Sequence, residues 1–312
     1  MSGGATIASV AKEFEEQPSL LRSLRESAVW SEFGDTGDLT LVGAGDSYAA
    51  SLCASFLSGP RVRAWDPYSL TESIESARGR IVCIISISGE TKANIDLARA
   101  LRGVAERTAC ITSNPKSRLA QAVDSVVALP YNPPGKSPGI ASFTCALAAA
   151  LKVCGFDPEL DFKEALSRSR GESRRIKVAS GSNVTYFVGN NEAYALSVYG
   201  AAKVYEFLGA RAQASMLEEF SHMQLFSLSP SDCVNVIEFP DGTRGELLSE
   251  KLKRAGYDVS LIRPEGGNVE RLYNLVFAIQ TAAIAAARKR GLDAPYFLRA
   301  KKKLRISDEM IY

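Results

Sequence analysis

The chain has 312 residues, 46% of them hydrophobic, and a formal net charge of +2 from 37 basic and 35 acidic side chains. This length predicts about two domains at ~150 residues each. The balanced charge excludes a global field that would attract nucleic acid or an anionic membrane. The apolar stretches fall short of the ~18–20 clean residues of a membrane-spanning helix, and the N-terminus lacks the order of a signal peptide. We therefore expect a cytoplasmic protein.

Neither a disulfide framework nor a metal site is indicated. No cysteines form a C-x-x-C pair, and most lie in apolar runs, so we expect small, reduced core residues. They are Cys53, Cys83, Cys110, Cys145, Cys154 and Cys233. The chain has a single histidine, His222, and no cluster of metal ligands. We expect no cofactor.

The first half of the chain alternates short apolar strands with helices. A helical segment is expected over residues 1–30, with Pro18 interrupting it and opening a second helix. The expected strands are Leu39–Gly43, Pro60–Asp66, Ile81–Ile85, Thr108–Ser113 and Ser125–Pro130. Helices are expected near 48–57, 69–78, 93–101 and 141–153. Such alternation predicts a parallel sheet with helices on both faces.

The strand–turn–helix pattern then starts again in the second half of the chain. The segment VGNNEAYAL at 188–196 is a weak repeat of VGAGDSYAA at 42–50. Strands are expected at Val184–Gly189, Cys233–Phe239 and Val259–Arg263, and helices near 162–178, 194–208, 245–255 and 269–290. The predicted fold class is α/β, with two doubly wound parallel-sheet domains of flavodoxin-like or Rossmann-like type. The predicted division is a helical segment over 1–30, domains over 31–160 and 161–294, and a C-terminal tail over 295–312.

Three turns in the first half are rich in small and hydroxyl residues. Ser86-Ile87-Ser88-Gly89-Glu90-Thr91 follows the buried strand Ile81–Ile85, Gly45-Asp46-Ser47 follows the first strand, and Gly139-Ile140-Ala141-Ser142 opens a helix. Free backbone N–H groups and the positive end of a helix dipole favour an anion, best a phosphate. The alternative is that these side chains merely cap their helices. In a doubly wound sheet the three turns could converge on one phosphate.

These motifs resemble the sugar isomerase (SIS) domain family, in particular the isomerase half of glucosamine-6-phosphate synthase and its stand-alone relatives. The resemblance covers nearly the whole chain. Glu13-Phe14-Glu15-Glu16-Gln17-Pro18 is similar to the family's E-x-x-E-Q-P motif, and Ser-x-Ser-Gly-Glu-Thr at 86–91 is its most specific motif, intact here. The resemblance implies a sugar-phosphate site with Gly45 and Gly89 in support. Its phosphate ligands would be Ser47, Ser86, Ser88, Thr91, Ser142 and the backbone N–H of Ile87.

The second half matches the family at fixed spacing. Lys203-Val204-Tyr205-Glu206 is similar to the family's Lys-x-x-Glu, and His222 lies sixteen residues after Glu206, with Glu219 three before it. Leu298-Arg299-Ala300-Lys301 resembles the tail that carries a family lysine. The resemblance implies catalytic roles for Glu206, His222, Lys203 and Lys301, supported by Glu219.

The chain departs from the family pattern in two places. The usual His-Gly-Pro is His222-Met223-Gln224 here, so the loop after the histidine could sit differently. The tail is extended and basic, which leaves open whether Lys301, Lys302 or Lys303 faces the site.

The chemistry of aldose–ketose interconversion suits these residue types. A histidine with a pKa near its natural value of about 6.5 can open the sugar ring. A partly buried carboxylate can carry a proton between C1 and C2, and a lysine can form an imine with the ketose. Clamping the phosphate supplies binding energy away from the reacting carbons.

The sequence predicts a phosphosugar isomerase/deaminase that converts glucosamine 6-phosphate to fructose 6-phosphate and ammonia. Alternatives are a phosphoglucose/phosphomannose isomerase, which differs in the C2 substituent of the substrate, and a non-catalytic sugar-phosphate sensor. A nucleotide-binding dehydrogenase is disfavoured because neither glycine turn reads G-x-G-x-x-G. No N-terminal cysteine nucleophile is present, so we expect no glutamine hydrolysis. By the same resemblance we expect a homodimer in which the histidine reaches the partner subunit's site.

Overall fold

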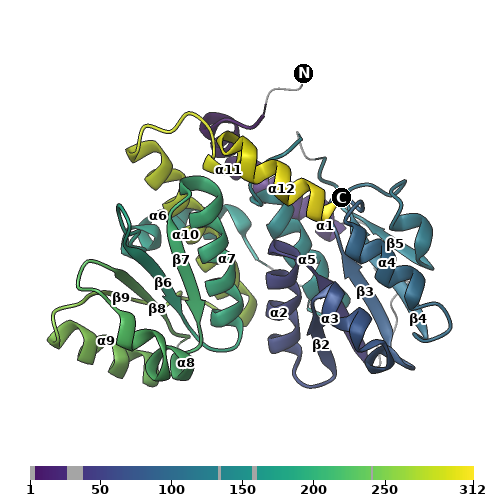
Figure 1. The fold of residues 1–312 in the computed structure, drawn as a ribbon, viewed down its shortest axis with the longest axis horizontal. Helices are drawn as coiled ribbons and strands as arrows, with labels where there is room; N and C mark the ends of the chain where they lie inside the picture. The colour runs from purple at the N-terminus through teal and green to yellow at the C-terminus, as the bar shows by residue number, and fades with distance from the viewer. Residues whose placement is uncertain (1–3, 27–37, 133–134, 157–159, 240–241) are drawn as a thin grey trace. The chain divides into compact units, whose positions relative to one another are not determined.

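The computed structural model describes residues 4–26, 38–132, 135–156, 160–239 and 242–312. The chain divides into two compact units, each built around one parallel sheet (Figure 1). The β1–β5 unit comprises Glu16–Pro134, Ala141–Asp157 and Lys302–Tyr312. The β6–β9 unit comprises Met1–Glu15, Gly135–Ile140 and Pro158–Lys301. The predicted α/β class with two parallel sheets is confirmed; the predicted domain boundaries stay a prediction.

The β1–β5 unit has a five-stranded sheet in the order β2-β1-β3-β4-β5. Its strands, all parallel, are β1 (Leu39–Gly43), β2 (Val62–Trp65), β3 (Ile81–Ile85), β4 (Arg107–Thr112) and β5 (Ser125–Ala128). This unit contains the helices α2 (Asp46–Ser58), α3 (Pro67–Glu72), η2 (Ile74–Ala77), α4 (Lys92–Ala100), η3 (Ala120–Ala122), α5 (Ala141–Val153) and, from its second residue on, α12 (Lys301–Ile311). Every residue of β1 and β3 is buried, which explains the unbroken apolar sequence of β3.

The core of this unit lies against the sheet. Val42, Val82 and Ile84 pack with Leu70 of α3 and with residues of α4 such as Leu97. Helix α2 contacts β1 and β2, and α5 contacts α2 and β4. The strands therefore end in turns whose positions are fixed by packing on both sides.

The β6–β9 unit has a four-stranded parallel sheet in the order β7-β6-β8-β9. Its strands are β6 (Val184–Val188), β7 (Arg211–Ser215), β8 (Cys233–Ile237) and β9 (Asp258–Ile262). The helices are α6 (Phe162–Glu172), η4 (Ser173–Arg175), α7 (Glu192–Leu208), α8 (Leu217–His222), η5 (Gln224–Ser227), α9 (Arg244–Arg254), α10 (Asn268–Lys289) and α11 (Tyr296–Arg299). Its core includes Tyr186, Val234 and Val236 packed with Phe220 and Leu252.

Some local expectations were wrong. Helix α1 (Ile7–Glu26) runs without a break through Pro18, although an interior proline costs about 3 kcal/mol; burial of Phe14 and Leu21 on one stripe offsets this loss. The helix expected over 162–178 ends at Glu172 and continues as a short 3-10 turn. Strand β7 was not anticipated, because this edge strand alternates exposed and buried residues in the polar sequence RAQAS.

The cysteines are core residues, as expected. None of the six forms a disulfide, and all but the partly exposed Cys154 are buried. Burial raises the pKa of Cys110 to about 12 and that of Cys154 to about 11, so both stay protonated at neutral pH. In the described parts of the chain, every helix is too short or too polar to cross a bilayer.

Candidate functional site

Two of the predicted phosphate turns leave neighbouring strands of the β1–β5 unit. Gly43, at the end of β1, is the register partner of Ile85, at the end of β3. The turn that contains Ser47 and the turn Ser86–Thr91 therefore emerge side by side at the carboxyl edge of the sheet. In open α/β sheets this edge is where ligands bind.

Glycines shape both turns. Gly89 has a φ of +66°, and a side chain there would overlap the hydroxyl group of Ser117. A Cβ on Gly43 would lie 2.5 Å from the carbonyl carbon of Ser47. Only glycine allows these close approaches without a shift of the backbone. The Gly89 carbonyl also accepts a hydrogen bond of 3.0 Å from the N–H of Leu119, which fixes the turn.

The Ser86–Thr91 turn presents hydroxyl groups that do not cap the helix it precedes. Thr91 is the N-cap residue of α4, yet its side chain makes no capping hydrogen bond. Ser88 accepts a bond of 3.2 Å from the N–H of Glu90, within the turn. Ser86 is 4% exposed, whereas Ser88 and Thr91 are partly exposed. The arrangement leaves the first turn of α4 open to an anion.

Glu90 stabilises this turn through its contacts with Arg118. Its carboxylate lies 2.5 Å from Arg118 and also accepts a bond of 3.1 Å from the backbone N–H of Arg118. The Arg118 hydrogen bond holds the pKa of Glu90 below its usual range. Glu90 therefore remains charged and paired, which explains its place in the motif without a direct role in chemistry.

The third turn leads into α5. Ser142 is the second residue of that helix and is partly exposed. Helix α5 packs against α2, the helix that carries Ser47 in its first turn. The residues before Ala141 belong to the β6–β9 unit and form an irregular segment.

Lys203 and Glu206 lie near the end of α7 in the β6–β9 unit and form an ion pair. The Lys203 side chain is 0% exposed, and that of Glu206 is 30% exposed. The Lys203 Nζ atom also donates to the Gly139 carbonyl oxygen at 3.3 Å and lies 4.9 Å from the ring centroid of Tyr199. Glu206 can thus meet a substrate, whereas the ammonium group of Lys203 is enclosed by protein.

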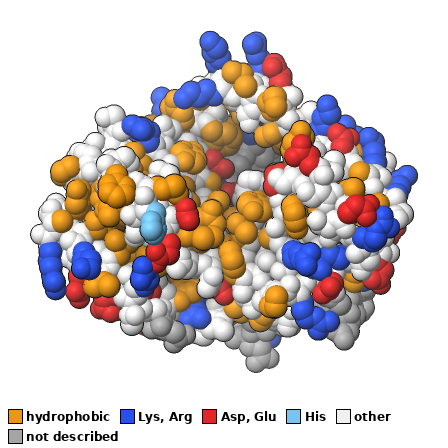
Figure 2. Space-filling view, turned by 60° about the horizontal axis from the view of Figure 1, so that its bottom comes forward, with side chains coloured by type: hydrophobic (Ala, Val, Ile, Leu, Met, Phe, Trp, Pro, Cys, Tyr) orange, Lys and Arg blue, Asp and Glu red, His pale blue; other side chains and the backbone are white. Residues whose placement is uncertain are grey.

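His222 is the last residue of α8, and its side chain is 78% exposed. Figure 2 shows the imidazole, in pale blue, at the surface. Its Nε2 atom lies 3.7 Å from the carboxylate of Glu218, which also pairs with Arg244. Glu219 is exposed, and its carbonyl accepts a bond of 3.0 Å from Met223. Nothing encloses the histidine on this surface.

Glu206 and His222 lie at opposite edges of the second sheet. Helix α7 starts after β6, at the carboxyl edge, and Glu206 is fourteen residues along it, or about 21 Å at the α-helical rise of 1.5 Å. Strand β7 then returns to the carboxyl edge, where α8 begins and the Leu217 N–H bonds to Asn190 at 3.1 Å. The two side chains of one copy are therefore too far apart to act on the same carbon atoms.

Lys301, Lys302 and Lys303 start α12 and are all exposed. Their exposure does not separate the three candidates. The basic tail forms the amphipathic helix α12, which has no buried residue.

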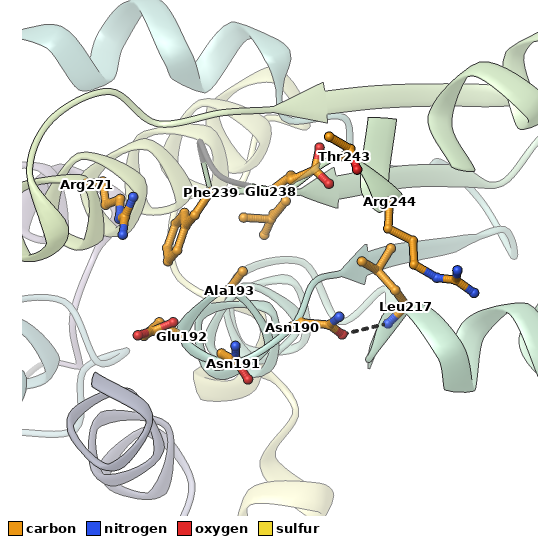
Figure 3. A pocket seen from close by; sticks show the side chains of 12 residues that line it. Asn190, Asn191, Glu192, Ala193, Leu217, Glu238, Phe239, Thr243, Arg244 and Arg271 are labelled. Carbon is orange, nitrogen blue, oxygen red and sulfur yellow. Dashed lines mark hydrogen bonds between the residues drawn. The ribbon is translucent and has the colours of Figure 1, made fainter. Parts of the chain in front are cut away.

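A cavity of about 400 Å³ opens at the carboxyl edge of the β6–β9 sheet. Figure 3 shows Arg271 beside Phe239 on one side and Asn190, Asn191 and Glu192 on another. Sequence reasoning did not single out this cavity, although it lies where the internal repeat places the counterpart of the phosphate turns.

The internal repeat extends to the backbone. Asn191 has φ 51° and ψ −124°, nearly the conformation of Gly45, at φ 57° and ψ −126°, and each residue is the N-cap of its helix. A Cβ on Gly189 would lie 2.7 Å from that of Ala193, just as Gly43 meets Ser47. Ala193 therefore stands where the first unit has the hydroxyl of Ser47.

The second difference between the two units is Glu238. Its N–H bonds to Ile262 at 3.0 Å, as the N–H of Ser86 bonds to Ile111 at 2.9 Å, so the two residues are equivalent. The Glu238 carboxylate is 5% exposed and accepts bonds from the N–H groups of Gly245 at 2.6 Å and Glu246 at 3.0 Å. A carboxylate of the chain itself thus occupies the anion position in the β6–β9 unit.

No group of three or more His, Cys, Asp or Glu residues in the described ranges is placed to hold a metal ion.

No family model matches the chain. A curated relative, the isomerizing glutamine–fructose-6-phosphate aminotransferase of Sulfurisphaera tokodaii, is 25% identical over 271 residues, which cover 77% of this chain and 44% of the relative. The chain thus spans less than half of that relative's length.

Three solved structures share the fold over nearly the whole chain. The C-terminal domain of the glucosamine-fructose-6-phosphate aminotransferase of Francisella tularensis matches with a TM-score of 0.69 and 17% identity, covering 91% of this chain and 96% of that one. A glucosamine-6-phosphate deaminase of Thermotoga maritima gives 0.71 and 19%, covering 91% and 96%. The tagatose-6-phosphate ketose/aldose isomerase of Escherichia coli gives 0.73 and 18%, covering 94% and 97%.

The chain therefore has the fold of the phosphosugar isomerases. Its resemblance to the sugar isomerase (SIS) family, and within it to the isomerase half of glucosamine-6-phosphate synthase, is confirmed by the fold match and by the distant relative.

Proposed function

We propose that this protein is a phosphosugar aldose–ketose isomerase/deaminase that converts glucosamine 6-phosphate and water to fructose 6-phosphate and ammonia. The observation that carries the proposal is the open Ser86–Thr91 turn, which lies beside the Ser47 turn in the β1–β5 unit. In the β6–β9 unit, the carboxylate of Glu238 fills the corresponding position. The relatives whose names include glucosamine 6-phosphate or fructose 6-phosphate support this substrate class.

The proposed roles follow from chemistry and exposure. Hydroxyl groups and the Ile87 N–H hold the phosphate of the substrate; the hydroxyls are those of Ser47, Ser86, Ser88, Thr91 and Ser142. Glu206, partly exposed and paired with a buried ammonium group, carries the proton between C1 and C2. His222 opens the sugar ring, and Lys301 or a neighbouring lysine forms an imine with the ketose or stabilises the enediolate. Lys203 pairs with the Glu206 carboxylate and holds it in place.

The active form in this proposal is a cytoplasmic homodimer with shared sites. Glu206 and His222 of one copy lie at opposite edges of a sheet, so a histidine that acts with Glu206 has to come from a second copy. Each sheet is assigned to the doubly wound class, with ligands at its carboxyl edge. The ligand is a small hexose 6-phosphate; no nucleic acid or membrane takes part.

The first test is an assay of purified protein with glucosamine 6-phosphate and glucose 6-phosphate, scoring fructose 6-phosphate and ammonia. Equal amounts of fructose 6-phosphate and ammonia from the amino sugar support the deaminase. Turnover of glucose 6-phosphate alone moves the protein to the phosphoglucose isomerase alternative. Tight binding of either sugar without turnover supports the sensor and contradicts an enzyme.

The role of Glu206 is tested with Glu206→Gln, which keeps the side-chain volume. The proposal requires a loss of turnover of at least about a hundredfold, as for removal of a general base. Intact turnover of both substrates in this variant rules out the proton-shuttle role.

Shared sites are tested by mixing two inactive variants, Glu206→Gln and His222→Ala, under conditions that exchange subunits. A heterodimer would contain one site with both native residues. Random exchange should therefore restore about a quarter of the native activity. Absence of any recovery, with exchange verified by mass, contradicts the shared site.

A further inference from the structure

The segment Gly135–Ile140, here called the strap, is the irregular chain that leads into α5 and its Ser142. Ile140 is 0% exposed, and Gly139 is partly buried. Buried backbone carbonyls need hydrogen-bond partners, and outside helices and sheets these have to come from side chains. The hydrogen-bond partners of the strap carbonyls therefore show which side chains hold this segment in place.

Three completely buried side chains of the β6–β9 unit supply those bonds. Tyr199 and Lys203 of α7 both donate to the Gly139 carbonyl, the Tyr199 hydroxyl at 2.7 Å. Gln280 of α10 donates from its Nε2 atom to the Ile140 carbonyl at 3.4 Å and to the Tyr199 hydroxyl oxygen at 2.9 Å. Because the amide donates to the phenol oxygen, the phenol proton is directed at Gly139.

Two residues of α1 hold the same stretch of chain at other points. Ser137 donates to the Glu13 carboxylate at 3.3 Å, and Thr144 of α5 donates to the Gln17 side-chain oxygen at 2.6 Å. Glu13 and Gln17 are 8% and 0% exposed and lie one helical turn apart. Both belong to the Glu13–Pro18 motif, for which the proposed reaction gives no role.

A buried polar network of this kind costs more to form than apolar packing, and in return it fixes one geometry. Its bonds end at Ser137, Gly139, Ile140 and Thr144, on both sides of Ser142 along the chain. A group that binds the phosphate lies away from the reacting carbons, so its displacement weakens substrate binding more than it slows the chemical step.

We infer that Tyr199 and Gln280, which hold the strap, and Gln17, which holds Thr144 of α5, are positioning residues of the sugar-phosphate site that together set the position of Ser142. The inference rests on the proposed function, in which Ser142 binds the phosphate. Lys203 takes part in two ways, because the same ammonium group bonds to the Gly139 carbonyl and to Glu206. None of the three positioning residues touches the substrate.

The test compares Tyr199→Phe and Gln280→Leu with the matched control Tyr186→Phe, a buried tyrosine of the same unit whose ring packs against Phe220 instead. Calorimetry measures the affinity for fructose 6-phosphate, kinetics separate KM from kcat, and amide hydrogen exchange is followed over residues 136–145. Loss of one buried hydrogen bond should weaken fructose 6-phosphate binding about three- to tenfold. We expect KM to rise by a similar factor, kcat to change less than about twofold, and exchange over 136–145 to become faster.

The control should behave as the native protein in all three measurements. Faster exchange with unchanged affinity would overturn the inference, since the strap would then be held for stability alone. Unchanged exchange and affinity would overturn it as well. If the native protein binds no hexose 6-phosphate, the proposed function fails; faster exchange confined to the two variants would then still support the hold on the strap, and unchanged exchange would refute it.

Discussion

Removal of the Lys203 ammonium group tests how much the Lys203–Glu206 ion pair stabilises the end of α7. In Lys203→Met the side-chain volume is nearly kept, but the Glu206 carboxylate loses its ion pair and the Gly139 carbonyl loses one of its two donors. Breaking a fully buried pair costs about 3–5 kcal/mol. Glu206 is 30% exposed and can recover water, so we expect the free energy of unfolding to fall by about 2–3 kcal/mol.

The assay is urea unfolding followed by circular dichroism, applied to a double-mutant cycle with Glu206→Gln. Glu206→Gln should cost more than Lys203→Met, because it separates a 0% exposed ammonium group from its carboxylate. The double variant should be more stable than the sum of the single losses predicts, by about 1–3 kcal/mol. Additive losses, or a Lys203→Met loss below about 1 kcal/mol, would refute the reasoning.

Three further predictions concern stability, each measured by urea unfolding. Gly89→Ala should cost about 2–4 kcal/mol, because alanine resists a φ of +66° and its Cβ overlaps Ser117; native-like stability would contradict this close contact. Hydrogen bonds from the backbone and hydroxyl of Thr108 lower the pKa of Asp124, so its stabilisation is present above about pH 4 and is lost as the pH falls through the lowered value. Asp124→Asn should therefore be less stable than the native protein at pH 7 and approach it at pH 3; a constant difference would contradict the linkage. Glu238→Gln should cost about 1.5–3 kcal/mol, since it weakens charge-assisted bonds at the start of α9; an unchanged midpoint would contradict this.

Much of the fold could be predicted because buried parallel strands have a simple signature. Ile81–Ile85 is apolar at every position and is buried at every position, so its sequence left few alternatives. Strand β7 lacked this signature, since it lies at the sheet edge and buries only some of its residues. Continuity of α1 through Pro18 could not be predicted either, because it depends on tertiary burial of residues around it.

The candidate site was predictable where it depends on local turns, and less so where it depends on burial. The Ser86–Thr91 turn is formed by residues close together in sequence. Its Gly89 cannot be replaced by a larger residue, because a Cβ there would overlap Ser117 of a later turn. The complete burial of Lys203 could not be predicted from the sequence, because the same helix carries the partly exposed Glu206 three residues later. Tyr199 and Gln280 were missed because their partners, Gly139 and Ile140, are far away in sequence. One signal was present: a glutamine in the apolar run VFAIQTAAIAA is unusual and indicates a buried hydrogen bond.

The internal repeat allows the proposed phosphate turns of one unit to be compared with their counterparts in the other unit. Both units keep the strand, the glycine that follows it and the same N-cap conformation, because these features are needed to pass from a buried strand into a helix. What differs is the chemistry of two positions, Ser47 against Ala193 and Ser86 against Glu238. The buried Glu238 carboxylate accepts bonds from two backbone N–H groups and pairs with Arg263 at 2.8 Å, so it already satisfies the donors that an anion would bind. The repeated backbone is therefore a structural requirement, and the capacity for phosphate depends on the side chains at those two positions.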